Sequence, residues 1–110
     1  INGNGEEKLD FTYIEDLIEG IICSIKSKNS LQETFNITYG NSRTVNALLN
    51  LLKENFSKVN VSYKKRDKLM PLRGTLDISK AKKLIKFNSQ WSLEKGYLKY
   101  IDWYKKLFKF

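Results

Sequence analysis

Four stretches of the chain place apolar residues three or four positions apart, which is the spacing that predicts an amphipathic helix. The stretches cover residues 14–25, 47–56, 78–85 and 93–108. In the first of them, the apolar residues on one face are Ile14, Leu17, Ile18, Ile21, Ile22 and Ile25. The last has a wide apolar stripe of Leu93, Tyr97, Tyr100, Ile101, Tyr104 and Phe108. Asn46, Asp77 and Ser92 are the expected N-caps of the second, third and fourth helices.

Three other stretches favour extended backbone. "DFTY" (10–13) is short and aromatic, "ETFNITYG" (33–40) ends in a glycine turn, and "KVNVSYKK" (58–65) alternates apolar with polar residues. We therefore expect three strands and about four helices in the order β-α-β-α-β-loop-α-α, which is an α/β fold. With 110 residues and no low-complexity segment, the chain is expected to form a single domain, 1–110.

The positive charge is concentrated in one segment. The chain has a net charge of +8, and ten basic residues against two acidic ones lie between Lys58 and Lys86. Such a field favours an anionic partner: a nucleic acid, an acidic surface or a phosphorylated ligand. For the lysines, a solvated lysine-rich face is the simpler explanation.

Several classes of protein are disfavoured by the composition. No apolar run has the roughly 20 residues of a membrane span, and the single cysteine, Cys23, cannot form an internal disulfide. We expect Cys23 to be a buried small apolar residue in a reducing, cytoplasmic setting. The chain has no histidine, and no complete catalytic cluster or metal-ligand pattern is visible. Glu15 and Asp16 are expected to favour the helix that they begin, through the helix dipole.

Four stretches together resemble one family. "DFTYIEDLIEGI", "ETFNITYGN", "RGTLDISKAKKLIKF" and "SLEKGYLKYIDWY" resemble, in order and spacing, the carboxy-terminal part of the extended short-chain dehydrogenase/reductases. More narrowly, they are similar to the NAD-dependent nucleotide-sugar epimerases and dehydratases, of the UDP-glucose or UDP-glucuronate 4-epimerase kind. The resemblance covers about residues 3–107.

The resemblance also implies what this chain does not carry. Members of the family have an amino-terminal Rossmann half with a glycine-rich NAD fingerprint, and a Tyr-x-x-x-Lys pair for catalysis; neither motif is present in these 110 residues. The chain is therefore expected to be a carboxy-terminal fragment of a bacterial-type enzyme that binds a nucleotide-diphosphate sugar. We expect it to be inactive alone, to carry no catalytic residue and to bind no cofactor itself, with NAD held by the absent half.

The same resemblance indicates the substrate-binding residues. Arg66 and Arg73 lie in the loop where the family supplies contacts to the diphosphate, a role that suits a planar, permanently charged guanidinium. Asp10 and Tyr13 lie where the family's chain passes the substrate pocket, although a turn anchor and a packed aromatic ring explain them as well. Leu9 stands where the family usually has an arginine, and Lys86 where it usually has a helix-ending glycine, which predicts a positive φ at Lys86.

Two alternatives stay open. The basic segment and six tyrosines would suit a small nucleic-acid-binding module, but the tyrosines are expected to be buried on the last helix. A protein-interaction domain would have exposed apolar surface. We expect such surface at residues 14–25 and around Phe35, where the absent half would pack, and we therefore expect the isolated chain to self-associate.

Overall fold

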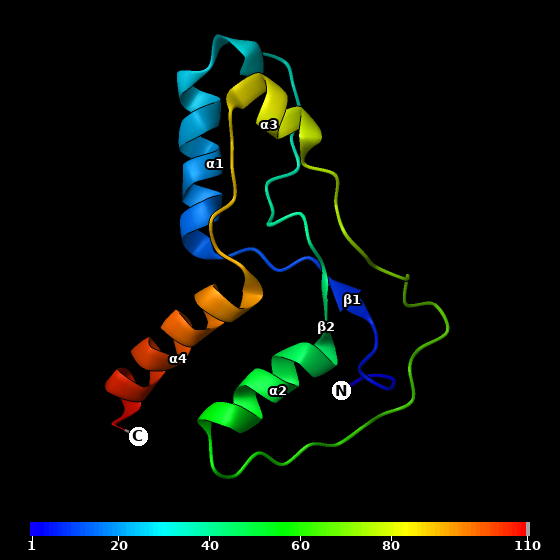
Figure 1. The fold of residues 1–110 in the computed structure, drawn as a ribbon. Helices are drawn as coiled ribbons and strands as arrows, with labels where there is room; N and C mark the ends of the chain where they lie inside the picture. Colours follow the sequence, from blue (N-terminus) through cyan, green and yellow to red (C-terminus); the bar gives the residue numbers. More distant parts are fainter. Residues whose placement is uncertain (110) are drawn as a thin grey trace.

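The computed structural model describes residues 1–109 and confirms the α/β fold with its four α-helices (Figure 1). They are α1 (Ile14–Lys26), α2 (Val45–Asn55), α3 (Ser79–Ile85) and α4 (Leu93–Phe108). A short 3-10 turn, η1 (Lys28–Ser30), follows α1. β1 (Lys8–Leu9) and β2 (Arg43–Thr44) form an antiparallel pair with Lys8 opposite Thr44. In Figure 1, α1 and α3 lie at one end, α2 and α4 lie at the other, and the strand pair lies between them.

The expected strands at 10–13, 33–40 and 58–65 are wrong. Paired backbone is limited to the two-residue strands and to a single bridge between Asn2 and Lys64 in the described part of the chain. The alternation of apolar and polar residues indicates which side chains face inward, but it does not supply a neighbouring backbone to pair with. In the segment 33–40, Phe35 and Ile37 instead pack against the core formed by α1 and α3.

The helix starts differ from expectation in detail. Ser92 caps α4 as predicted, because its hydroxyl accepts the Lys95 N–H. The prediction for Asn46 is wrong: Thr44 caps α2 by accepting the Ala47 N–H, and the Asn46 amide donates to Asn4 and Glu6. At α3 the N-cap residue is Ile78 rather than Asp77, although an Asp77 carboxylate oxygen accepts the Ser79 N–H at 2.8 Å.

The core is small and lies where α3 meets α1. Ala81, Ile85 and Phe87 are buried there, with Cys23, Phe35, Ile37 and Leu84 packed against them. The expectation that the region around Phe35 would be exposed is therefore wrong, because Phe35 is half-buried in this cluster. Between α2 and α4, the buried apolar residues are Leu49, Leu93 and Ile101.

The molecule is flat and open. Its extents are 49 × 39 × 17 Å and its radius of gyration is 16.6 Å, against about 13 Å for a compact domain of this length. It exposes 8185 Å², roughly 1,900 Å² more than the ~6,300 Å² expected for a compact protein of this mass. The aliphatic face of α1 is exposed, as the sequence predicted. None of the helices within residues 1–109 combines the length and apolar character that crossing a membrane requires.

Candidate functional site

Two of the four predicted site residues line one hollow. This hollow has a volume of about 420 Å³. One wall is formed by β1 and the residues that follow it, and the other wall is formed by the loop that precedes α3. Asp10 and Arg73 both contribute to its wall, and the full lining is Leu9, Asp10, Phe11, Thr12, Arg73, Gly74 and Leu76. Residues 63 positions apart in the sequence thus meet at one place.

Asp10 holds this hollow together. Its two carboxylate oxygens accept backbone N–H groups from Gly40, at 3.1 Å, and from Leu76, at 3.0 Å. Gly40 has a φ of +79°, and a Cβ there would lie 2.7 Å from Ile78 Cδ1. Glycine at position 40 therefore allows the positive φ and the close approach to Ile78. The Asp10 carboxylate ties Gly40 and the loop at 74–76 to the end of β1.

Arg73 is the cationic group of the hollow. Its side chain is exposed, and within residues 1–109 its guanidinium makes no ion pair or hydrogen bond. A guanidinium in this state can pair two oxygens of a phosphate without first breaking a contact inside the protein.

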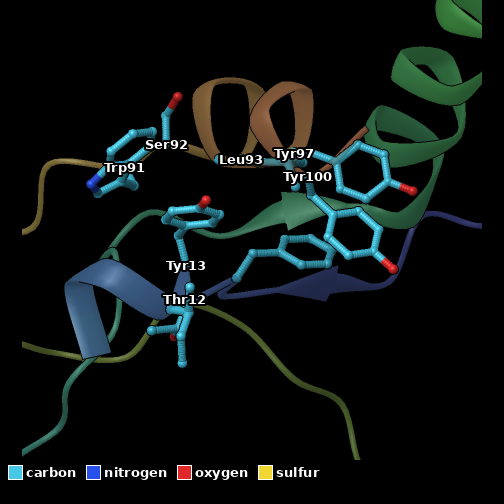
Figure 2. A pocket seen from close by; sticks show the side chains of 10 residues that line it. Thr12, Tyr13, Trp91, Ser92, Leu93, Tyr97 and Tyr100 are labelled. Carbon is cyan, nitrogen blue, oxygen red and sulfur yellow. The ribbon is translucent and has the colours of Figure 1, made fainter. Parts of the chain in front are cut away.

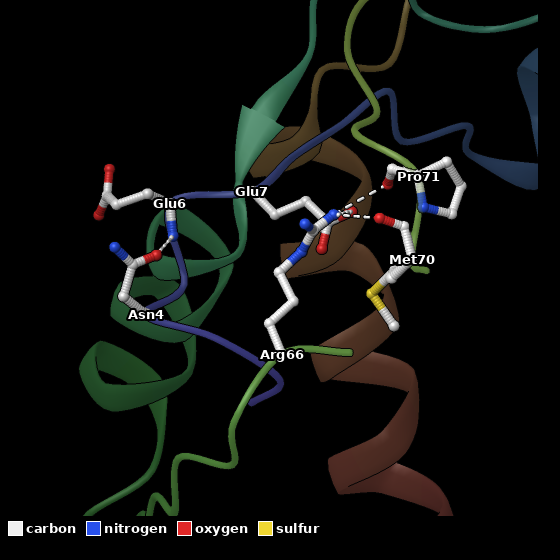
Figure 3. A network of polar contacts seen from close by, with 6 residues as sticks. All are labelled: Asn4, Glu6, Glu7, Arg66, Met70 and Pro71. Carbon is white, nitrogen blue, oxygen red and sulfur yellow. Dashed lines mark hydrogen bonds and ion pairs between the residues drawn. The ribbon is translucent and has the colours of Figure 1, made fainter. Parts of the chain in front are cut away.

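Arg66 is held elsewhere. Its guanidinium donates to the backbone carbonyls of Met70, at 2.9 Å, and Pro71, at 3.0 Å, and lies 3.9 Å from a Glu7 carboxylate oxygen (Figure 3). These contacts close the turn that begins the 66–71 loop. The structure thus gives Arg66 a loop-stabilising position, apart from the wall formed by Asp10 and Arg73.

Tyr13 lines a second, more apolar hollow of about 270 Å³. Figure 2 shows Tyr13 beneath Trp91, with Tyr97 and Tyr100 further along the same hollow. The ring centres of Tyr13 and Trp91 are 4.7 Å apart. The Nζ atoms of Lys95 and Lys99 lie 4.2 and 4.5 Å from the centre of the Trp91 ring. Tyr13 is thus part of a cation–aromatic cluster that joins α1 to α4.

Sequence reasoning missed the role of Asp16. It is only 3% exposed, and its carboxylate oxygens accept the N–H groups of Gln90 and Trp91 at 2.8 and 3.0 Å. Its place in the first turn of α1 suggested only a favourable interaction with the helix dipole. The sequence carried one signal that Asp16 is buried: it lies four residues before Gly20, whose missing side chain lets the same face of the helix approach Ile37.

Neighbouring groups shift the pKa values of two charged side chains on α4, Lys99 and Glu94. A hydrogen bond to Glu15, at 2.5 Å, raises the pKa of Lys99. Burial alone would raise the pKa of Glu94, but hydrogen bonds from its own backbone N–H, from Ser92 and from Arg43 together lower it. No three histidine, cysteine, aspartate or glutamate side chains gather into a possible metal site anywhere from residue 1 to residue 109.

Comparison with known proteins gives relatives along nearly the whole chain. No family model matches. The UDP-glucuronate 4-epimerase of Thermodesulfobacterium geofontis is 33% identical over 107 residues, which are 96% of this chain and 32% of that protein. The chain therefore spans about a third of the length of its relatives.

Solved structures agree with this match. The UDP-glucose 4-epimerase of Thermotoga maritima, solved with UDP-glucose, superposes with a TM-score of 0.87 at 30% identity, covering 98% of this chain and 35% of that one. The UDP-glucuronic acid 4-epimerase of Bacillus cereus, solved with UDP-glucuronic acid and NAD, gives 0.85 at 29% identity, covering 97% of this chain and 35% of that one.

The fold and the sequence agree: this α/β chain is similar to about a third of the length of nucleotide-sugar epimerases. The chain is similar to the carboxy-terminal part of the extended short-chain dehydrogenase/reductases, as its four sequence stretches predicted.

Proposed function

We propose that this chain is the nucleotide-sugar-binding part of an NAD-dependent sugar-nucleotide 4-epimerase or dehydratase. One observation carries the proposal: the chain matches UDP-sugar epimerases along almost its whole length. Its fold supports the proposal, because it brings Asp10 and Arg73 into one hollow. Nucleotide sugars carry a diphosphate, and a guanidinium is well suited to bind one.

Arg73 is the group that we propose to contact the diphosphate. Because its guanidinium has no partner within residues 1–109, binding would cost little rearrangement. Asp10 positions the loop that carries Arg73, through its hydrogen bond to Leu76. One oxygen lone pair on each side of the carboxylate is left to accept a sugar hydroxyl.

Arg66 and Tyr13 stay predictions as substrate contacts. Arg66 would have to release the carbonyls of Met70 and Pro71 before it could bind a phosphate. Tyr13 lies in the neighbouring hollow with Trp91, where it could contact a part of the ligand that extends beyond the diphosphate.

The residues of this chain do not fit NAD. A dinucleotide site needs a glycine-rich turn that leads into a helix N-terminus, where the pyrophosphate binds. Instead, α1 begins after Tyr13 and carries Glu15 and Asp16 in its first turn, and α2 begins after Thr44 without a glycine cluster. We propose that the redox chemistry belongs to an amino-terminal Rossmann half and that residues 1–110 alone are inactive.

The proposal is tested by calorimetric titration with UDP-glucuronic acid and UDP-glucose. Arg73→Ala should weaken binding by roughly 10-fold or more, because it removes a charge-assisted hydrogen bond. Lys68→Ala is the matched control, because it removes one exposed positive charge from the same loop and should change the affinity less than about 2-fold. Equal losses in both variants would mean that general charge attraction, and not the hollow, binds the ligand.

One observation keeps a nucleic-acid-binding function in consideration. The expectation that the tyrosines of the last helix would be buried is partly wrong, because Tyr100 is 48% exposed and Trp103 beside it is 54% exposed. Exposed rings among lysines can stack on bases. Anisotropy titrations with single-stranded and duplex oligonucleotides over a salt series separate the two functions, since nucleic-acid binding should fall steeply with salt.

A further inference from the structure

The loop that carries Arg73 is not fixed by packing. Arg73, Gly74, Thr75 and Leu76 are all exposed, and a Cβ placed on Gly74 would meet no atom within 4 Å. A glycine in such open space gives the backbone beside Arg73 more conformational freedom than another residue would. The order of this loop must therefore come from its hydrogen bonds.

In the described part of the chain, Thr75 is the first residue after Arg73 that a hydrogen bond ties to another segment. Its Oγ1 accepts the backbone N–H of Ser42 at 3.1 Å and lies 2.7 Å from the Ser42 Oγ, so the two hydroxyls share a second hydrogen bond. Ser42 immediately precedes β2, which pairs with β1, and the next residue, Arg43, forms an ion pair with Glu94 of α4. Thr75 is thus tied to a part of the fold that is itself held on two sides.

Two further hydrogen bonds hold the next two residues of the loop. Asp10 accepts the Leu76 N–H at 3.0 Å, and the side-chain amide of Asn36 donates to the Asp77 carbonyl at 3.0 Å. Three consecutive residues, beginning with Thr75, are thus bound to three different segments. Of these three contacts, the one at Thr75 lies closest along the chain to the guanidinium of the hollow, so it limits most directly how far that group can move.

We propose that Thr75, through its hydrogen bonds to Ser42, is a positioning residue for Arg73. This inference rests on the proposed function, because it takes Arg73 as the group that contacts the diphosphate. Thr75 lies outside the wall of the hollow that Asp10 and Arg73 line, so it acts on the ligand through Arg73. By ordering the loop before the ligand arrives, the two hydroxyls reduce the conformational entropy that is lost on binding.

Calorimetric titration with UDP-glucuronic acid tests the role of the Thr75 hydroxyl. Thr75→Val keeps the shape of the side chain but removes its hydrogen bonds, and it should weaken binding by roughly 5-fold. Thr75→Ser retains a hydroxyl, and its affinity should stay within about 2-fold of that of the unmodified chain. Thr34→Val is the matched control and should leave the affinity unchanged, because Thr34 is also exposed and makes no hydrogen bond in the described part of the chain. Unchanged affinity in Thr75→Val, or an equal loss in Thr75→Ser, would overturn the proposal.

A double-mutant cycle separates positioning from a direct or general effect of Thr75. In an Arg73→Ala background, Thr75→Val should cause no further loss of affinity, because the group that Thr75 positions is absent. Equal losses in the two backgrounds would contradict this inference alone. Failure of the unmodified chain to bind UDP-glucuronic acid would contradict the proposed function, and with it the inference that rests on it.

A measurement without ligand tests the ordering of the loop itself. The heteronuclear ¹H–¹⁵N NOE of the Arg73 and Gly74 amides should fall in Thr75→Val, because the loop gains fast motion when its hydrogen bonds to Ser42 are lost. The same signals should be unchanged in Thr34→Val. Unchanged NOE values in Thr75→Val would overturn the proposal, whatever the ligand does.

Discussion

Two aspartates hold distant parts of the chain together by the same means. Asp10 accepts the N–H groups of Gly40 and Leu76, and Asp16 accepts those of Gln90 and Trp91. Each carboxylate thus links its segment to backbone at least 30 residues away along the chain. A carboxylate that accepts several backbone N–H groups contributes more to stability than an exposed ion pair does.

Replacing Asp16 should therefore be costly. Asp16→Ala leaves the N–H groups of Gln90 and Trp91 without their acceptors in a part-buried place, and we expect it to lower the free energy of unfolding by about 3 kcal/mol. Urea denaturation measures the change. Glu19→Ala, on the exposed side of the same helix, is the control and should cost less than about 1 kcal/mol. Equal losses would show that the buried carboxylate has no special role.

Lys86 confirms a prediction made from sequence. It ends α3 with a φ of +59°, in the left-handed region that glycine tolerates best. Lys86→Gly should therefore stabilise the chain by about 1 kcal/mol, seen as a higher melting temperature. Lys83→Gly, within α3, should instead destabilise it by a similar amount, because glycine weakens a helix interior. If Lys86→Gly also lowered the melting temperature, strain at position 86 would not be the relevant effect.

At the scale of elements, the helices could be predicted from sequence and the strands could not. Helix formation depends on local spacing and caps, so α1 and α4 were predicted within one residue at each end. A strand needs a partner, and the stretches at 33–40 and 58–65 have none that the described part of the chain supplies beyond the bridge at Lys64. The site shows the same limit: the sequence proposed Asp10 and Arg73, but only the fold could bring them together and separate them from Arg66 and Tyr13.

The start of α4 should give the stability a defined pH dependence. The folded pKa of Glu94 lies below its usual value of 4.5, because the hydrogen bonds from its backbone N–H, Ser92 and Arg43 outweigh burial. The stabilisation from Glu94 is then present above pH 4.5 and lost as the pH falls through the lowered folded pKa. Melting temperatures measured from about pH 6 down to about pH 3 should fall less steeply in Glu94→Gln than in the unmodified chain. Parallel curves would contradict this.

At the scale of the whole molecule, the chain has an open shape and is much shorter than the relatives that it matches. The chain spans about a third of the epimerases it matches, its core is small, and the apolar side of α1 faces outward. Composition and charge could not reveal this, because 41% apolar residues are enough for a compact domain. The molecule thus leaves the apolar face of α1 uncovered.

The most direct test of the central claim is NMR titration of the ¹⁵N-labelled chain with UDP-glucuronic acid. We predict that the amide signals of Arg73, Gly74 and Leu76 shift with increasing ligand, and that these shifts disappear in Arg73→Ala. The ¹⁵N signals of the 80–84 segment of α3, which lies outside the hollow, should stay in place and serve as the internal control. Saturating ligand that leaves residues 73–76 unchanged would contradict the account.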